Sequence, residues 1–307
     1  MRRRTSFAFV TVIVVFLIIS TVYAEKITAS PKKTPSDIPE GSSLSVPDWL
    51  KRIDYGMTFE TDQKPRLYFE TVQPLYQSED KLSTFFTHDR ISLQDERGTY
   101  SAGLGYRRLL FNENMLAGIN TFFDYQDLQR HYRQGVGLEA LSKTLELRGN
   151  GYFGLSPKRL IEDTTGSKTY EKVSTGGDIE LGGPIPYVPR VKMFGSYYRY
   201  NFTHSSDMKG WKARSEFKPF KLITINLETF DDNKGSREWR VETRLCLNLE
   251  DFGSKKDFFS NFRFADEPFP NVDLKKRTLD RVERNFNIQV EKWKQAANGT
   301  ISIRRGN

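Results

Sequence analysis

The sequence predicts an all-β fold, a 12-stranded antiparallel transmembrane β-barrel, and three observations lead to it. Segments of about ten residues alternate between apolar and polar side chains from residue 53 to residue 249. Clusters of turn-forming residues separate these segments. After residue 24, no apolar run approaches the roughly 20 residues that a membrane-spanning helix needs. A barrel strand needs only about 9–11 residues and exposes every second one to lipid.

The average composition is polar, which a barrel with a polar lumen tolerates. Hydrophobic residues make up 37% of the chain and the mean hydropathy is −0.59. Aromatic residues make up 13%, which suits girdles of aromatic side chains at two membrane interfaces. The formal net charge of +8 is modest and spread along the chain, so it indicates no nucleic-acid partner. Cys246 is the single cysteine, which excludes an intramolecular disulfide and a cysteine-rich metal site.

The first 24 residues have the pattern of a secretory signal peptide. Three arginines follow Met1, an apolar stretch runs over residues 7–19, and small residues stand at Val22 and Ala24. We expect cleavage after Ala24. An uncleaved helical anchor is the alternative, because the apolar segment approaches spanning length. In both cases the rest of the chain crosses the inner membrane.

Twelve segments of the following region have the period-two pattern of strands. The number is even, as a single-chain bacterial barrel requires for both of its ends to lie in the periplasm. The predicted strands are 53–60, 66–76, 82–93, 99–109, 115–125, 134–142, 144–155, 170–181, 190–202, 209–217, 222–230 and 239–249. Residues 156–168 form the longest polar connection and are a candidate extracellular loop.

The charged side chains on these strands are expected to face the lumen. In residues 115–125, Ile119 and Phe123 belong to one face, whereas the polar residues belong to the other. A charge that faces lipid at mid-bilayer costs about 2–4 kcal/mol, so the polar face points inward. The predicted lumen-facing residues are Asn120, Asp124, Glu139, Glu146, Arg148, Asn150, Arg240, Glu242 and Arg244.

A soluble all-β sandwich or a lipocalin-like barrel also shows regular strands and is the structural alternative. Two features weigh against it. Opposite charges occupy the middle of the polar faces, and the apolar faces are longer than an average soluble strand.

Several segments resemble the β-domain of the inverse autotransporter (intimin/invasin) family. The most specific order is Asn-Thr-Phe-Phe-Asp-Tyr at 120–125, then Gly-Val-Gly-Leu-Glu-Ala at 135–140, then Asn-Gly-Tyr-Phe at 150–153. Residues 69–76, 86–90 and 103–107 resemble the same family. The resemblance covers about residues 50–250 and implies an outer-membrane barrel of the type V secretion class.

A second resemblance lies beyond the barrel, where Val-Glu-Arg-Asn-Phe-Asn-Ile at 282–288 matches the core of the family's linker. In relatives this segment re-enters the pore, forms a short helix and passes outward, so residues 274–283 are expected as a helix and those from Ile288 as an extended piece. The alternative is a solvated tail that does not dock. The candidate pore-threading residues are Leu279, Arg281, Arg284, Asn285, Asn287 and Ile288.

The expected organisation has four parts and a transport function. Residues 1–24 are the signal peptide, 25–52 a periplasmic lead-in, 53–250 the barrel, and 251–307 a linker or plug with a short tail at the cell surface. Only a short segment follows Gln295, so we expect a translocator and anchor with little or no passenger of its own. Adhesion is not carried over from the resemblance, and the sequence identifies neither a host receptor nor a separate passenger.

The expected partners are outer-membrane lipid and lipopolysaccharide, the β-barrel insertion machinery and periplasmic chaperones, with no nucleic acid. Two other functions stay open. The barrel is alternatively a small porin-like channel, or the truncated remnant of a surface adhesin.

The sequence indicates no enzyme. The three histidines, His88, His131 and His204, are scattered, and no Ser-His-Asp or metal-ligand spacing stands out. His88 and Asp89 are neighbours on one strand and therefore face opposite sides of it. We expect no catalytic residue, no metal and no cofactor.

Overall fold

The computed structural model describes residues 49–220, 222–246, 264–296 and 300–304. The expected signal peptide at residues 1–24, its cleavage site at Ala24 and the lead-in as far as residue 48 lie outside the described residues. So do residues 247–263, which belong to the region between the barrel and the C-terminal segment.

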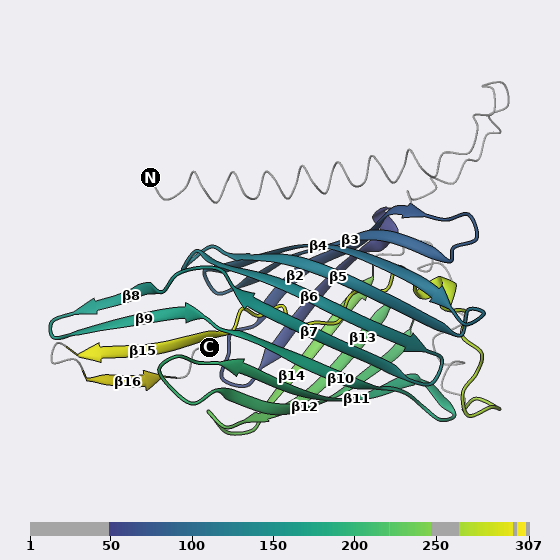
Figure 1. Ribbon diagram of the computed structural model, residues 1–307. Helices are drawn as coiled ribbons and strands as arrows, with labels where there is room; N and C mark the ends of the chain where they lie inside the picture. The colour runs from purple at the N-terminus through teal and green to yellow at the C-terminus, as the bar shows by residue number, and fades with distance from the viewer. Residues whose placement is uncertain (1–48, 221, 247–263, 297–299, 305–307) are drawn as a thin grey trace, which may run out of the picture.

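Twelve antiparallel strands close into a barrel, as the alternation predicted (Figure 1). Their order around the barrel is β1-β14-β13-β12-β11-β10-β7-β6-β5-β4-β3-β2. Each strand pairs with its sequence neighbour except where β7 meets β10 and where β1 meets β14 to complete the ring. The barrel strands are β1 (Ile53–Glu60), β2 (Arg66–Gln77), β3 (Ser83–Gln94), β4 (Arg97–Leu110), β5 (Met115–Gln126), β6 (His131–Ser142), β7 (Glu146–Gly154), β10 (Thr175–Ile185), β11 (Val188–Asn201), β12 (Met208–Phe220), β13 (Ile223–Asp232) and β14 (Glu238–Cys246).

A second sheet of four strands extends from one end of the barrel (Figure 1). Its order is β16-β15-β9-β8, and every pairing in it is antiparallel. The strands are β8 (Arg159–Thr164), β9 (Ser167–Val173), β15 (Val290–Ala296) and β16 (Ile301–Arg304). Gly166 has φ +90° in the turn of the β8–β9 hairpin, a conformation that glycine adopts without steric cost.

This sheet changes two sequence-based expectations. The single strand predicted for residues 170–181 is the end of β9 and the start of β10, which are separated at Ser174. The polar connection at 156–168 is not a loop, because it contains β8 and the beginning of β9. Alternation continues across Ser174, so the pattern could not reveal that the chain changes its pairing partner there.

Inward and outward positions alternate along the barrel strands as expected. In β5, Leu116 and Phe122 are buried, whereas Ile119 between them is 56% exposed. Glycines make room for the large inward rings: a Cβ at Gly105 would lie 2.2 Å from the Phe86 ring. The outward face carries many apolar side chains. Its exposed apolar side chains include Phe59, Leu67, Phe69, Leu104, Ile119, Val136, Leu138, Leu147, Ile179, Leu181, Met193, Tyr197 and Leu227.

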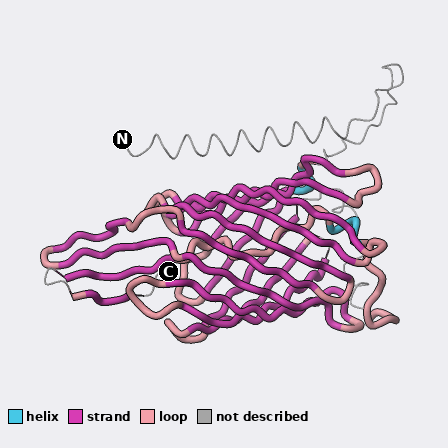
Figure 2. The backbone as a smooth tube through the Cα atoms, viewed as in Figure 1, coloured by secondary structure: helices cyan, strands magenta, loops and turns pink. Residues whose placement is uncertain are grey.

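The two ends of the barrel differ. We call one the turn end; it carries short connections such as 78–82 and 111–114 together with the 3-10 helices η1 (Leu50–Arg52) and η4 (Leu274–Arg277) (Figure 2). The other is the hairpin end, from which the β8–β9 hairpin extends. Within the described part of the chain, no helix is long and apolar enough to cross a membrane.

The closed hydrogen-bonded ring predicts heat-modifiable migration in detergent gels. Unboiled protein is expected to stay folded and to migrate faster than boiled protein, because SDS at room temperature does not open a barrel without free strand edges. The measurement is gel electrophoresis of the outer-membrane fraction with and without boiling. A soluble periplasmic protein without a heat shift would contradict the membrane barrel.

Candidate functional site: the lumen and its linker

The lumen is lined by buried ionised side chains arranged in two main groups. The first lies on β2, β3 and β14 and centres on Glu70, which is 3.1 Å from Arg90 and 3.5 Å from Arg244. Glu242 joins it through Tyr68, whose hydroxyl donates a 2.5 Å hydrogen bond. Each acid therefore has a cationic or hydroxyl partner, as buried charges require.

The second group lies on β7, β10, β11 and β12. Arg148 contacts both Glu146 and Glu180, the latter at 3.3 Å. Arg214 is 2.6 Å from Glu180, and Lys192 is 2.8 Å from Glu146. Together these pairs cross-link four neighbouring strands on the inside of the wall.

The structure places the nine predicted lumen residues on inward positions. Asp124 and Glu146 are almost fully buried, and Glu139 pairs with Arg107 at 2.5 Å. Asn150 donates to Asp178 at 2.9 Å, and Arg240 bridges Glu60 and Glu228. The remaining members Asn120, Arg148, Glu242 and Arg244 are each less than 10% exposed.

A segment at 274–289, which we call the linker, lies inside this lumen and begins at the turn end. Leu274 packs among Leu109, Leu116 and Leu141 of the wall. Arg277 forms a 2.8 Å ion pair with Glu146, and Lys275 forms one of 2.7 Å with Glu113. These contacts fix the point at which the chain enters the pore.

The expected helix at 274–283 is shorter in the structure. Helix η4 ends at Arg277, and the chain from residue 278 to residue 289 has no helix. The Lys- and Arg-rich composition favours a helix, but the wall supplies hydrogen bonds to the main chain and thereby removes the need for helical ones.

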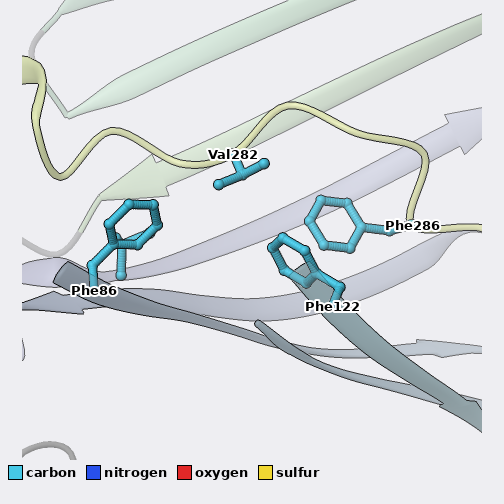
Figure 3. Close-up of a cluster of buried hydrophobic side chains, with 5 residues drawn as sticks. Phe86, Phe122, Val282 and Phe286 are labelled. Carbon is cyan, nitrogen blue, oxygen red and sulfur yellow. The ribbon is translucent and has the colours of Figure 1, made fainter. Parts of the chain in front are cut away.

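Apolar side chains hold the middle of the linker. Val282 and Phe286 face Phe86 and Phe122 of the wall, as Figure 3 shows. The rings of Phe122 and Phe286 meet edge to face with centroids 6.0 Å apart. Leu279, one of the predicted residues, packs against the same cluster.

Arg281 and Arg284 attach the linker to different strands of the wall, Arg281 to β2 and β14 and Arg284 to β5. Arg281 lies 3.0 Å from Glu70 and 3.3 Å from Glu242. Arg284 forms two hydrogen bonds with the carboxylate of Asp124, at 3.0 and 2.8 Å. The second contact is bidentate, the strong and geometrically specific form of an Arg–carboxylate pair.

The predicted residues Asn285, Asn287 and Ile288 lie toward the hairpin end. The Asn285 side chain donates to the Tyr200 hydroxyl at 3.0 Å, and the Asn287 side chain accepts from Arg66. Ile288 is buried with Val173 and Val290.

The linker leaves the lumen as strand β15. The Ser174 N–H donates to the Gln289 carbonyl at 2.9 Å, and β15 then pairs with β9 along its whole length. The carboxylate of Glu291 accepts from the N–H groups of Thr203 and His204 at 2.7 and 2.6 Å. Trp293 is 2% exposed and stacks on Tyr170.

The connection 202–207 beside this exit is held by its own ion pair. Asp207 accepts hydrogen bonds from Arg199 at 3.0 and 2.5 Å and one from the Phe202 N–H at 3.2 Å. These donors, Arg199 first, lower the pKa of Asp207 below its ordinary value. The carboxylate is therefore ionised at neutral pH and keeps the connection in place against Glu291.

Sequence reasoning missed several wall residues that contact the linker, among them Glu70, His88, Arg107 and Arg133. Glu70, His88 and Arg107 occupy inward positions of predicted strands, and Arg133 directly precedes the strand predicted for 134–142. The alternation therefore offered a signal for three of them, but it did not indicate contact with a segment so distant in sequence. The Nδ1 atom of His88 accepts from the Val282 N–H at 3.2 Å. Asp89, the next residue of β3, points to the opposite side of the strand, where it is 3% exposed, so it does not join His88 in one site.

Ser156, His131 and Glu171 also come together, although their spacing gave no sign of it. His131 Nδ1 is 3.2 Å from Ser156 Oγ, and its Nε2 is 3.3 Å from Glu171 Oε1. All three are at most 5% exposed. The trio ties β6 to β9 at the base of the hairpin. Among the described residues, no group of three or more His, Cys, Asp and Glu side chains is arranged to hold a metal ion.

Space remains beside the linker toward the hairpin end. The lumen keeps a cavity of about 220 Å³. Its lining on β12, β13 and β14 includes Lys212, Glu228 and Arg240. The linker therefore lies against one side of the lumen, and charged side chains line the space on the other side.

The shared carboxylate of Asp124 leads to a prediction. Asp124→Asn leaves Arg133 and Arg284 buried without their common anion, which is expected to weaken linker docking by about 3–5 kcal/mol. Hydrogen exchange of linker amides in detergent micelles should accelerate while amides of the barrel strands stay protected. Asp163→Asn, which changes an exposed carboxylate of the β8–β9 hairpin, is the control. Unchanged exchange in Asp124→Asn would show that this pair does not hold the linker.

Comparison with known proteins shows the family to which this chain belongs. The family model described as "Inverse autotransporter, beta-domain" matches residues 36–286. The chain is 27% identical over 269 residues to "Inverse autotransporter adhesin YeeJ" of Escherichia coli (strain K12), covering 81% of this chain and 11% of that protein. It is 27% identical over 276 residues to "Invasin" of Yersinia enterocolitica, covering 85% of this chain and 32% of that protein.

A solved structure from work on membrane proteins ("Unveiling the Mechanism Behind the in-meso Crystallization of Membrane Proteins") has a similar fold. Its TM-score is 0.62 at 19% identity, with coverage of 78% of this chain and 99% of that one. The chain thus spans about a tenth of one relative and about a third of the other. The closed barrel, its occupied lumen and the family match identify this chain as a member of the inverse autotransporter β-domain family, an outer-membrane β-barrel translocator domain.

Proposed function

We propose that this domain anchors its chain in the outer membrane and carries the C-terminal segment through the pore to the cell surface. The turn end faces the periplasm and the hairpin end faces outward. Bacterial outer-membrane barrels have short periplasmic turns and longer extracellular loops, and the longest connection of this barrel, 155–174, is at the hairpin end. β1 begins and β14 ends at the turn end, as an even number of strands requires.

The observation that carries the proposal is the course of the linker. It enters at η4, contacts wall strands β2, β4, β5 and β7 and continues into β15 beyond the barrel. A solvated tail would not bury Val282 to 1% exposure or Arg284 against Asp124. The contacts therefore support a chain that passes outward through its own barrel.

The proposed partners follow from the apolar outward face of the barrel and from the family of the chain. The apolar outward face meets outer-membrane lipid, and we propose lipopolysaccharide as its outer-leaflet neighbour. We further propose insertion by the β-barrel assembly machinery after escort by periplasmic chaperones. We propose no enzymatic reaction for the domain.

The proposed threading predicts where the C-terminus is found. Protease added to intact cells is expected to remove an epitope tag placed after Asn307, because the segment after β15 is outside. A tag in the turn at 111–114 should survive until the outer membrane is permeabilised. A C-terminal tag that survives on intact cells, with the barrel correctly inserted, would rule out this direction of threading.

A second candidate function, a small porin-like channel, is favoured by the 220 Å³ cavity beside the linker. Deleting residues 271–307 should raise single-channel conductance in planar bilayers, since the deletion removes the side chains that fill the pore. The full-length protein is expected to be closed or to conduct weakly, because the linker occupies the lumen. Equal, high conductance of the two proteins would favour the channel over the plugged translocator.

A further inference from the structure

We propose that the lumen holds a binding track for the main chain of an extended polypeptide of any sequence, formed by Arg107 and Arg133 with Asn150 between them. The inference rests on the proposed translocation function and assigns its ligand class and residues. The lumen makes two kinds of contact with the linker: contacts to the main chain, which any polypeptide can make, and contacts to side chains, which only the linker makes.

The first element of the track is Arg107 on β4. Its Nε donates to Glu139 at 2.5 Å, and its guanidinium lies 4.5 Å from the centre of the Phe86 ring. Its Nη atoms donate to linker carbonyls, to Thr278 at 3.1 Å and also to Asp280 and Arg281. The side chain has no exposed surface.

The second element, Arg133 on β6, repeats this arrangement. Its Nε donates to Asp124 at 2.8 Å, and its guanidinium lies 4.6 Å from the centre of the Tyr152 ring. Its Nη atoms donate to the carbonyls of Asn287 at 2.8 Å and Asn285 at 2.7 Å. Here too the side chain has no exposed surface. In both cases a wall acid orients the arginine and an aromatic ring supports it, while its outer nitrogens point to the chain.

Asn150 holds the stretch between the two arginines by donating to the Glu283 carbonyl at 3.3 Å. The carbonyls of residues 283, 285 and 287 accept from Asn150 and Arg133, at every second position along this part of the chain. An extended chain presents alternate carbonyls to one side, so this spacing matches extended backbone. Two N–H groups are also paired, Val282 with His88 and Asn285 with the Tyr152 hydroxyl.

Carbonyl groups are common to every residue, so these contacts do not depend on the sequence of the chain. The wall acids keep Arg107 and Arg133 oriented whether or not a particular segment is present, which lowers the entropic cost of binding. An extended segment that enters the lumen therefore meets donors already in position.

Other contacts use side chains and are specific to the linker. They are the pairs of Arg281 with Glu70 and of Arg284 with Asp124, and the packing of Phe286 against Phe122. These contacts select the linker as the segment that stays in the lumen, whereas the track accepts any segment.

The test uses a full-length protein in which residues 279–287 are replaced by alternating serine and threonine. The replacement removes the side-chain contacts and keeps the main chain. Glu70 retains Arg90 and Arg244, and Asp124 retains Arg133, so the wall keeps its charge balance. The measured quantity is the closed-state dwell time of single channels in planar bilayers. It is compared between proteins that keep Arg107 and Arg133 and proteins that lack one of them.

The track is removed with its wall acids, as Arg107→Met with Glu139→Gln and as Arg133→Met with Asp124→Asn. In the serine–threonine protein, each double substitution is expected to shorten the closed dwell about tenfold, since each removes hydrogen bonds from a charged donor to the chain. Arg107→Lys and Arg133→Lys should act in the same direction, because a point donor cannot hold the wall acid and two carbonyls together. These two lysine variants replace the double variants in the test if the double variants do not fold into a heat-modifiable barrel.

The matched control is Arg214→Met with Glu180→Gln. Arg214 is also buried, donates its Nε to Glu180 at 3.2 Å and lies over Phe194, but it belongs to β12, across the barrel from β4. This change should leave the dwell time unaltered. The proposed track would be wrong if the channel of the serine–threonine protein never closed. It would also be wrong if the closed-state dwell time of that protein did not change on loss of either arginine. Protease removal of the C-terminal tag from the native protein would show in either case that the translocation function itself stands.

Discussion

Lipid excludes ionised side chains from one face of each strand, and the rest of this structure depends on that constraint. The strands carry charge at many alternate positions, and closure of the sheet puts all of those positions into one narrow space. Acids and arginines there have to pair or bind another polar group. The wall groups around Glu70 and Glu146 satisfy most of this requirement among themselves. The linker satisfies more of it, because Arg277, Arg281 and Arg284 bring cations to Glu146, Glu70 and Asp124.

The same constraint explains how much the sequence revealed. The twelve barrel strands could be predicted because period-two alternation is imposed by lipid on one side and charge on the other. The lumen-facing positions, such as Asp124 and Glu146, followed directly from the side of each strand on which they stood. The alternation does not indicate which strands pair with each other. β9 and β10 read as one strand because Ser174 falls within a continuous alternation, although β9 pairs with β15 and β10 with β7 and β11.

The linker was recognised by its motif, but the predicted helix was too long, for a physical reason. Residues 278–283 contain good helix formers, and in water a helix would satisfy their main-chain groups. In the lumen, Arg107 and Asn150 donate to those carbonyls and His88 accepts from an N–H. Once side chains of the wall meet this need, extended backbone is no longer penalised, and it lets Val282 and Phe286 reach the aromatic cluster of the wall. A sequence window of the linker contains none of these wall residues, so it could not predict the outcome.

The sheet outside the barrel makes the passage asymmetric. β15 pairs with β9 from Val290 opposite Val173 to Ala296 opposite Ser167, and β9 is fastened to β6 through Glu171 and His131. Withdrawal toward the turn end would break this ladder as well as the contacts in the lumen. At the other end of the linker, Leu274 and Arg277 are held by side chains of the wall and not by a strand ladder. Because each tethered end keeps the intervening chain at high effective concentration near its sites, the lumen contacts can be individually modest and still keep the linker in place. A pore that must first pass a chain and then close on it needs contacts of this kind. Each contact is weak enough to let the chain move through the lumen, and together they are numerous enough to keep the linker there.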